Sequence, residues 1–340
     1  MENNHALTLH KLSVSAAKIN PDMLGASLYV PASHSDLLPI ANGDKITFLR
    51  SVIFCTEDAV ADSELGFAMA NLAHCLQTMR SDSSCLRFVR VRNPSILQRV
   101  LQMPGVEKLT GFVLPKLTNH NFDAYFSQIV GRHFVLMPTL ETIEVFDERE
   151  MQTLRENLTR PHVRPHILAL RIGGNDLLAL LGLRRARDMS LYRTPLGALI
   201  ARLVLQFHPY GLRLTAPVFE YLDNPNLLDQ EVREDLAHGL IGKTAIHPDQ
   251  VGLIERHFRI DQRELEMAES LLQENCPAVF RMHGAMCEVA THRQWAEQTL
   301  ARAQVFGSDT EQPENENVVN GLNSTSLNLV SNVTALVRSN

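Results

Sequence analysis

Charged side chains stand at the ends of successive short apolar runs along this sequence. In chain order they are Glu57, Asp58, Arg90, Arg92, Lys116, Glu141 and Asp176. If the apolar runs are parallel strands of one closed sheet, the residues that follow each strand meet at a single mouth. Two carboxylates with water suit a hard Mg²⁺ ion, and cationic neighbours suit an anionic substrate. The pattern therefore indicates metal-assisted chemistry on an anion.

Each of these residues alone has a more ordinary interpretation. A single acid after a strand is more often a helix N-cap or a solvated loop residue, and Asp58 precedes a helical pattern that begins at Ala61, as a cap would. His247, before a proline, equally suits packing or a turn. Convergence is what favours a site, because Glu141 and Asp176 follow neighbouring strands, next to cations from the two strands before them.

The elements that must position these residues form an alternating pattern. The strand-like runs are apolar, several are rich in β-branched residues, and Pro, Gly or Asn bounds several of them, which is typical of strands buried on both faces. The expected strands are Ser27–Pro31, Ser51–Thr56, Leu86–Arg92, Gly111–Pro115, Phe134–Pro138, His166–Ile172, Leu212–Ala216 and Ile241–Ile246. Amphipathic helical patterns between them include Ala61–Met79, Asn121–Val130, Pro195–His208 and Asp229–His238.

Eight strands, each followed by a helix, predict a (β/α)8 TIM barrel of the α/β class with a C-terminal helical extension. An open doubly wound sheet is the alternative, but the Gly-rich turn with a downstream acid that would support it is missing. The expected parts are an N-terminal segment at 1–25, the catalytic barrel at 26–260, the helical extension at 261–307 and a disordered tail at 308–340.

The extension and the tail differ in composition. Helical patterns at Gln262–Gln273 and Glu288–Ala303 are joined by a segment, Asn275–Cys287, that is expected to be irregular. From Ser308 onward the sequence is rich in Asn, Ser, Thr, Glu and Gln without periodicity, which predicts disorder.

The composition narrows the classes of function. With 45% hydrophobic residues the 340-residue chain can bury a large core, and its net charge of −6, without a basic stripe, argues against nucleic acid as a partner. Five cysteines without a CxxC pair argue against a disulfide framework or a zinc ribbon. No apolar stretch is long enough to span a bilayer, and no signal-peptide pattern begins the chain. A cytoplasmic protein without membrane or nucleic-acid partners is expected.

Seven motifs, in this order and spacing, resemble the citrate lyase β subunit and HpcH/HpaI aldolase family, which includes malyl-CoA lyases. The resemblance runs from about Ser27 to Gly307, and its last motif is the most specific. The motifs are Leu28-Tyr29-Val30-Pro31-Ala32, Glu57-Asp58-Ala59-Val60, Val89-Arg90-Val91-Arg92-Asn93-Pro94, Val113-Leu114-Pro115-Lys116, Glu141-Thr142, Gly174-Asn175-Asp176-Leu177 and Gly242-Lys243-Thr244-Ala245-Ile246-His247-Pro248-Asp249-Gln250-Val251.

The resemblance implies a carbon–carbon bond lyase that uses Mg²⁺, with Mn²⁺ as the alternative ion. Glu141 and Asp176 match the family's metal ligands. Arg90 matches the arginine that holds a substrate carboxylate or the developing oxyanion. Glu57 matches the acid near the metal waters and is the candidate proton relay, while Lys116 matches a lysine expected to give electrostatic support.

The resemblance also implies what the site binds. The substrate is expected to be a small carboxylate or an acyl-CoA or acyl-carrier thioester, cleaved or formed through a metal-stabilised enolate. Arg90 and three further residues, Arg92, Pro138 and Gly174, are expected to contact it, and the second arginine leaves the alignment one residue ambiguous. A homo-oligomer, trimer or hexamer, is expected.

The chain departs from the family pattern at three places, which puts it in a divergent branch. Cys55 replaces a frequent Asp, Ile143-Glu144 replaces Ala and a small or basic residue, and Asn175 replaces a Glu. These departures motivate an alternative hypothesis, a catalytically altered barrel that binds an anionic ligand or nucleotide as part of a biosynthetic assembly. A third hypothesis is an interaction protein whose partner contacts Met282–Met286 and Trp295.

Overall fold

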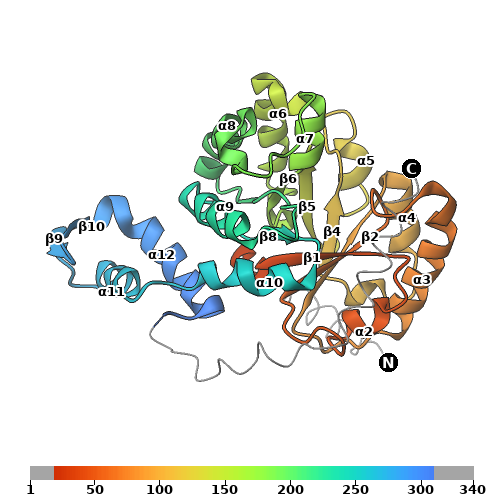
Figure 1. Ribbon diagram of the computed structural model, residues 1–340, viewed down its shortest axis with the longest axis horizontal. Helices are drawn as coiled ribbons and strands as arrows, with labels where there is room; N and C mark the ends of the chain where they lie inside the picture. The colour runs from red at the N-terminus through yellow and green to blue at the C-terminus, as the bar shows by residue number, and fades with distance from the viewer. Residues whose placement is uncertain (1–18, 310–340) are drawn as a thin grey trace, which may run out of the picture. The chain divides into compact units, whose positions relative to one another are not determined.

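The computed structural model describes residues 19–309, where strands and helices alternate along most of the chain (Figure 1). The strands of the main sheet are β1 (Ala26–Pro31), β2 (Ser51–Cys55), β3 (Leu86–Arg90), β4 (Gly111–Leu114), β5 (Val135–Leu140), β6 (Leu170–Ile172), β7 (Leu214–Thr215) and β8 (Lys243–Ala245). The helices are α2 (Leu37–Ala41), α3 (Leu65–Thr78), α4 (Pro94–Leu101), α5 (Phe122–Phe126), α6 (Glu148–Leu158), α7 (Gly174–Leu180), α8 (Pro195–Phe207), α9 (Pro225–Ala237), α10 (Pro248–Glu255), α11 (Gln262–Leu271) and α12 (Val289–Phe306).

The eight strands form one parallel sheet in the order β7-β6-β5-β4-β3-β2-β1-β8. The two end strands meet, since Ala216 forms a parallel bridge with Lys243 and the Ile241 backbone N–H donates to the Leu214 carbonyl at 2.8 Å. The predicted (β/α)8 TIM barrel is therefore confirmed. The carboxyl ends of its strands meet at one mouth, as the proposed chemistry requires.

The barrel interior is packed below that mouth. Because side chains alternate along a strand, every second residue points inward. Ile53, Phe88, Met137 and Ala169 belong to a small buried cluster that is separate from the larger cluster formed by the other strand faces and the helices. Two residues further along the same four strands, the inward face carries Cys55, Arg90, Thr139 and Arg171. The interior thus changes from apolar to polar as it approaches the mouth.

Two predicted helices differ in their boundaries, and local capping chemistry explains the first of them. The Asn224 side chain accepts from the Leu227 N–H and Pro225 occupies the first turn, so α9 begins four residues before the predicted Asp229. The predicted helix Asn121–Val130 is only the short α5. The alternative interpretation of Asp58 as a helix cap does not apply, since its carboxylate binds Arg90 and Lys116.

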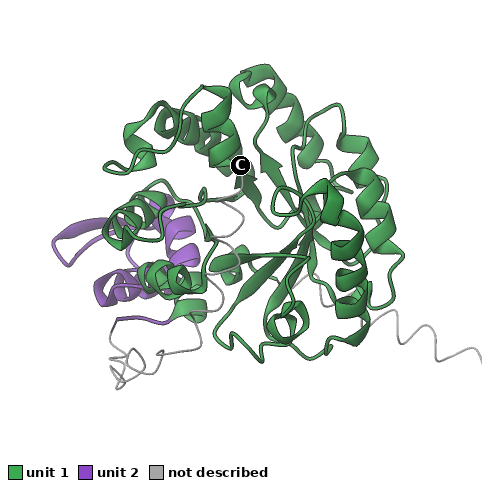
Figure 2. Cartoon of the chain, turned by 45° about the vertical axis from the view of Figure 1, so that its right-hand side comes forward, with its two compact units in different colours: residues 1–259, 300–306 green, residues 260–299, 307–340 purple. Residues whose placement is uncertain are grey.

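The chain forms two compact units, coloured separately in Figure 2. Among the described residues, the first unit holds 19–259 together with Leu300–Phe306, and the second holds Ile260–Thr299 and 307–309. In the second unit the expected helices are present as α11 and the first part of α12.

The segment Asn275–Cys287, expected to be irregular, contains an antiparallel hairpin of β9 (Val279–Met282) and β10 (Ala285–Glu288). Its two turn residues, His283 and Gly284, have φ of 49° and 84°. Two consecutive positive φ angles are typical of the tight turns that match strand twist. The glycine was the sequence signal for this turn.

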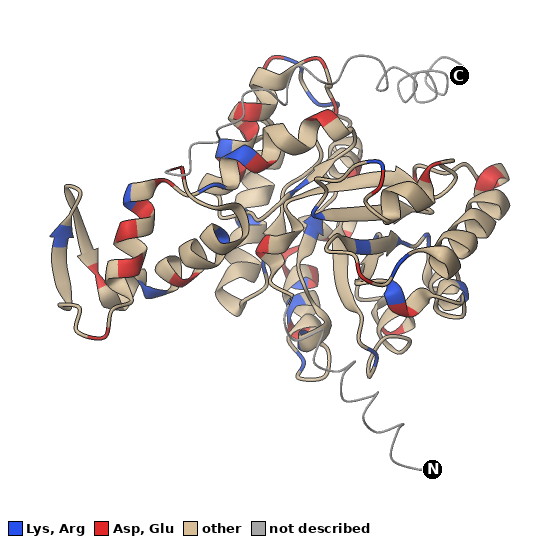
Figure 3. Ribbon diagram, turned by 90° about the horizontal axis from the view of Figure 1, so that it is seen from below, with Lys and Arg blue, Asp and Glu red and all other residues tan. Residues whose placement is uncertain are grey.

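The predicted disordered tail lies outside the described residues from residue 310 onward, as do residues 1–18. Within the described part of the chain, the helices are all too short or too polar to cross a membrane. Acidic and basic residues are interspersed over the ribbon (Figure 3).

Candidate active site

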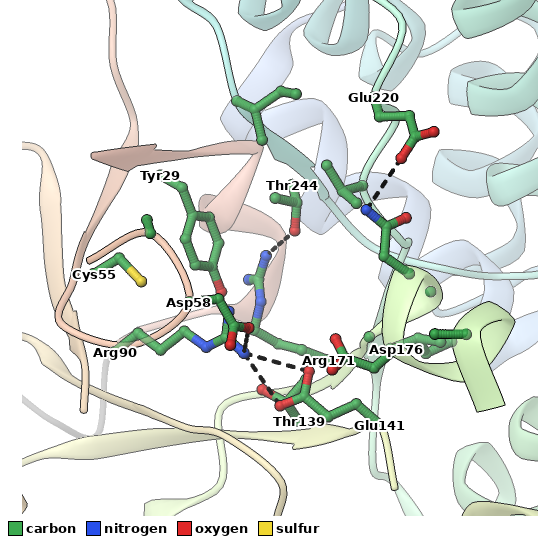
Figure 4. A pocket seen from close by; sticks show the side chains of 18 residues that line it. Tyr29, Cys55, Asp58, Arg90, Thr139, Glu141, Arg171, Asp176, Glu220 and Thr244 are labelled. Carbon is green, nitrogen blue, oxygen red and sulfur yellow. Dashed lines mark hydrogen bonds and ion pairs between the residues drawn. The ribbon is translucent and has the colours of Figure 1, made fainter. Parts of the chain in front are cut away.

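A cavity of about 550 Å³ opens at the carboxyl ends of the barrel strands (Figure 4). The residues that line it come from six strands and the segments that follow them, which explains why groups far apart in the sequence meet there. The polar and charged members are Tyr29, Cys55, Asp58, Arg90, Thr139, Glu141, Arg171, Asn175, Asp176, Glu220 and Thr244. Of the predicted site residues, Arg90, Glu141, Gly174 and Asp176 line the cavity directly.

Arg90, the last residue of β3, is the centre of an ion-pair cluster. One of its terminal nitrogens lies 2.7 Å from a Glu57 carboxylate oxygen, 3.0 Å from Asp58 and 3.2 Å from Glu141. The guanidinium is almost fully buried, and its Nε is buried without a hydrogen-bond partner. Arg90 therefore orients three carboxylates and keeps a donor for another group.

Glu57 and Lys116 do not line the cavity, but they contact residues that do. The Lys116 ammonium donates to Glu57 at 2.7 Å and lies 3.3 Å from Asp58 and 3.9 Å from Asp176. The Lys116 backbone has a φ of 50°, a rare value for a residue with a side chain. This conformation accompanies a hydrogen bond of 2.8 Å from the Lys116 N–H to the Glu141 carboxylate, so Lys116 contacts both proposed metal ligands.

Glu141 follows β5 directly, and its carboxylate is buried. Burial raises the pKa of Glu141 to about 7, and the Asp176 carboxylate acts in the same direction although Arg90 opposes it. Gly173 makes room for this side chain: a Cβ at that position would lie 2.4 Å from the Glu141 Cβ and from one carboxylate oxygen. The glycine after β6 is therefore part of the cradle that holds Glu141.

Asp176 lies in the first turn of α7, where the helix dipole favours negative charge. Its side chain is about one third exposed at 34%. Burial raises its pKa, and the charge of Asp58 adds to this effect. Asp176 and Glu141 thus line one cavity, and the negative charge of one makes ionisation of the other less favourable. A cation between them would offset this repulsion.

These two residues fit a Mg²⁺ ion. Their donors are carboxylate oxygens, the ligands that hard cations prefer, and Mg²⁺ is commonly held by one or two carboxylates while it keeps several waters. Within the described ranges, no group of three or more His, Cys, Asp and Glu side chains is arranged so that it could hold a metal ion by itself. Waters and substrate would therefore complete the coordination.

The structure does not bring two of the predicted substrate-binding residues to the cavity. Pro138 is a buried β5 residue between the inward-facing Met137 and Thr139, so strand alternation directs it away from the interior. The Arg92 guanidinium binds the backbone carbonyls of Thr56 and Glu57, at 3.2 and 3.3 Å, and holds the loop after β2. Arg90 is thus the arginine of this motif that faces the cavity.

Two of the three departures from the family pattern line the cavity. Cys55 does so as a thiol, because burial raises its pKa. The Asn175 amide donates to Glu220 at 3.3 Å. Ile143 and Glu144, the third departure, are not among the lining residues.

Sequence reasoning missed several groups that line the cavity, above all Arg171, together with Thr139, Glu220 and Thr244. Arg171 interrupts the apolar run Ile167–Ile172. A charged residue inside a strand that is buried on both faces was the available signal, because such a residue is rarely buried without a function or a partner.

Comparison with known proteins supports the same family. The sequence model of the C–C bond lyase family of the TIM-barrel fold matches residues 18–308. The (3S)-malyl-CoA thioesterase of Cereibacter sphaeroides is 26% identical over 291 residues, covering 83% of this chain and 95% of that protein. The mitochondrial citramalyl-CoA lyase of Mus musculus is 25% identical over 326 residues, covering 86% and 90%.

A solved structure shows the same fold. The CitE protein of Mycobacterium tuberculosis, in complex with magnesium, acetoacetate and coenzyme A, has a TM-score of 0.61 at 20% identity, covering 83% of this chain and 99% of that one. The resemblance seen in the seven motifs is thereby confirmed over most of the length. The chain belongs to the C–C bond lyase family of the TIM-barrel fold.

Proposed function

We propose that this chain is a divalent-metal-dependent lyase that breaks a carbon–carbon bond next to a hydroxyl-bearing carbon. The observation that carries the proposal is that Glu141 and Asp176 line one cavity next to Arg90. The proposed substrate is a hydroxy acid, either as the free carboxylate or as an acyl thioester.

Glu141 and Asp176 are the residues that would hold Mg²⁺. When bound, the ion supplies a Lewis acid that polarises a substrate oxygen, worth several kcal/mol of charge stabilisation. The magnesium in the CitE complex of M. tuberculosis supports this assignment, and so does the raised pKa of both carboxyl groups, since a cation would stabilise their ionised forms.

The remaining residues suit the proton and charge transfers of bond cleavage. The hydroxyl oxygen becomes a carbonyl oxygen as its proton leaves, and the electron pair of the broken bond moves to the departing carbon. Glu57 does not line the cavity itself, so it is the proposed acceptor of that proton through an intervening water. Burial raises the pKa of Glu57 and brings it closer to the range of a useful base. Arg90 lines the cavity, so its guanidinium is the proposed cation next to the developing negative charge.

The names of the curated relatives suggest the substrates to try first. (3S)-Malyl-CoA and citramalyl-CoA are thioesters of hydroxy acids, and the corresponding free acids test whether the thioester is needed. The family resemblance also supports a homo-oligomer, which light scattering during size-exclusion chromatography would measure.

The test compares Glu141→Ala and Asp176→Ala with a control, Asp44→Ala, which removes an exposed carboxylate paired with Arg80. Magnesium binding is measured by calorimetry, and cleavage of the two CoA esters by product release. We expect both site variants to lose Mg²⁺ binding and at least about 100-fold in kcat/KM. The control should match the unmodified protein.

Unchanged Mg²⁺ affinity in both site variants would remove the metal site and the lyase proposal with it. Magnesium-dependent ligand binding without any product would instead favour the alternative of an altered barrel that binds an anionic ligand.

A further inference from the structure

Arg171 is a buried cation that faces the cavity, and it has no charged partner among residues 19–309. It lies on β6, is 3% exposed and lines the cavity. Its guanidinium donates to the Thr244 hydroxyl and lies 3.7 Å from the Met137 sulfur. Figure 4 shows the guanidinium next to Tyr29 and directed toward Thr244. An arginine remains charged in proteins, so a full positive charge faces this cavity.

The other buried arginines of the described chain are compensated. Arg87 donates to two backbone carbonyls, at 2.7 and 3.1 Å. Arg185 pairs with Glu231 at 2.5 Å, and Arg90 pairs with three carboxylates. Arg171 alone among the four has neither a carboxylate nor a backbone carbonyl, and contacts a hydroxyl, a thioether and the Tyr29 ring instead. Because burying an uncompensated charge costs several kcal/mol, a purely structural role does not explain it.

Threonine side chains from two other strands, β5 and β8, accompany Arg171 in the cavity wall. Thr139 of β5 pairs in register with Arg171 and lines the cavity. The Thr139 hydroxyl is buried and has no hydrogen-bond partner. Thr244 of β8 accepts from Arg171 and still has its own hydroxyl proton to donate. Two hydroxyl donors and a guanidinium are thus available to one anionic group.

This cluster lies deeper than the proposed metal ligands. Arg171 is on β6 itself, whereas Asp176 follows that strand, and Thr139 precedes Glu141 by two residues on β5. The Tyr29 ring is shared, with the Arg90 guanidinium 5.9 Å and the Arg171 guanidinium 5.4 Å from its centroid. A small ligand that reaches past the proposed metal ligands and contacts Arg90 therefore also comes close to Arg171.

The carboxylates nearer the mouth are balanced by other cations and do not serve as counter-ions for Arg171. Four carboxylates, Glu57, Asp58, Glu141 and Asp176, face the two cations Arg90 and Lys116. A divalent ion would bring that cluster to neutrality. The charge of Arg171 is then available to a substrate.

We propose that Arg171, with the Thr139 and Thr244 hydroxyls, binds a second carboxylate at the inner end of the substrate. This inference rests on the proposed function and specifies its substrate class. The part of the substrate that lies deepest in the cavity carries a carboxylate of its own, in addition to the groups that face the metal site. A guanidinium with adjacent hydroxyl donors is well matched to a carboxylate, which accepts two parallel hydrogen bonds.

Matched ligands that differ only at the inner end test the proposal. Oxaloacetate and 2-oxobutanoate share a 2-oxo acid end and differ by a carboxylate in place of a methyl group. 2-Oxoglutarate and 2-oxopentanoate form a second pair that is one carbon longer. Two lengths are used because the distance between the 2-oxo acid end and the inner carboxylate depends on the substrate. Each dissociation constant is measured by calorimetry on the full chain, with and without Mg²⁺.

The variants separate binding from folding. Arg171→Met removes the charge with little change of length, and Thr244→Val removes one hydroxyl. Arg87→Met is the matched control, because it removes a buried arginine on β3 that binds backbone carbonyls away from the cavity. Thermal unfolding is recorded for each: Arg87→Met should lower Tm, whereas Arg171→Met should keep or raise it, because an uncompensated buried charge is lost.

We expect the unmodified protein to bind the diacid of at least one pair about 10- to 100-fold more tightly than the monoacid, the factor that a charge-assisted hydrogen bond provides. Arg171→Met should abolish this preference while monoacid affinity stays within about two-fold. Thr244→Val should reduce the preference, and Arg87→Met should retain it.

Equal affinity for both members of each pair, or an equal loss for both in Arg171→Met, overturns the second subsite and leaves the metal site intact. Failure of every ligand to bind in a Mg²⁺-dependent manner overturns the proposed function itself. The two failures are therefore distinguishable in one set of titrations.

Discussion

The absence of a side chain at Gly173 determines where the Glu141 carboxylate can lie. The φ of Gly173 is −84°, which any residue can adopt, so backbone freedom does not explain the glycine. The reason is steric, because the nearest atoms to an added Cβ are those of Glu141, at 2.4 Å. Contact of this kind cannot be accommodated without moving the carboxylate.

We therefore expect Gly173→Ala to weaken catalysis far more than folding. A displacement of the carboxylate by about 1 Å costs on the order of 100-fold in rate, and Mg²⁺ affinity should fall with it. The control is Gly252→Ala in α10, where nothing lies within 4 Å of the added Cβ. That change should leave activity unaltered and stabilise the helix by about 0.5–1 kcal/mol. Equal activity in the two variants would show that the Glu141 position is not critical.

Some of the site residues could be predicted from the sequence, and others could not. Glu141, Asp176 and Arg90 could be placed at one mouth because each ends a strand. The sequence does not show which of two nearby arginines faces the cavity. In the structure Arg90 lines the cavity, whereas Arg92 donates to the Thr56 backbone carbonyl. Arg171 was visible as a charge inside an apolar run, but its missing counter-ion could be recognised only in three dimensions.

At the scale of elements, a buried charge network joins β8 to α9 and to the segment before α8. Lys243 is fully buried and lies 3.0 Å from Glu231 and 2.9 Å from Asp235. The Tyr192 hydroxyl donates to Asp235 at 2.5 Å, and Arg185 pairs with Glu231. Lys243 precedes Thr244, so the network also fixes the strand that carries part of the proposed inner subsite.

Lys243→Met should destabilise the fold by about 3–5 kcal/mol, because it leaves the buried Asp235 carboxylate without its cation, whereas Glu231 keeps Arg185. The matched control is Arg187→Met, which breaks an ion pair whose side chains are 60% and 68% exposed. Exposed pairs contribute about 0–1 kcal/mol, so the control should unfold almost as the unmodified protein does. Urea denaturation followed by circular dichroism measures both. A similar small effect for Lys243→Met would mean that the network is not needed for stability.

Elements were more predictable than the segments between them. All eight strands were expected within a few residues, since apolar runs with β-branched residues depend on local sequence. The hairpin β9–β10 was missed because its strands are half exposed and short, with burial that alternates only weakly. The predicted helix Asn121–Val130 is shortened to α5, which was not evident from periodicity.

At the scale of the whole molecule, the free energy of unfolding depends on every group whose pKa changes on folding. His208 is one such group, at the C-terminal end of α8. Burial lowers its pKa to about 4, and the charge of Arg213 adds to this. Its Nε2 is buried and has no hydrogen-bond partner, so no acceptor stabilises the protonated ring.

Protonation of His208 therefore favours the unfolded state. In the unfolded chain the pKa is about 6.5, so the unfolded state binds a proton first as the pH falls. The stability that His208 contributes is therefore fully present above pH 6.5 and is lost as the pH falls toward the folded pKa of about 4. Acid thus lowers the free energy of unfolding by protonating His208 in the unfolded chain.

His208→Gln should remove this dependence, because glutamine has no proton to gain. Between pH 7.5 and pH 4.5 the unmodified protein is expected to lose about 2 kcal/mol more stability than the variant. Urea denaturation at the two pH values measures the difference. His74→Gln, at an exposed histidine of α3, is the control and should lose as much stability as the unmodified protein. If His208→Gln also loses as much, the ring is either already protonated in the folded state or solvated well enough to bind its proton there. The acid sensitivity of the barrel then has to come from carboxylates whose pKa is lowered on folding, such as the buried Glu231.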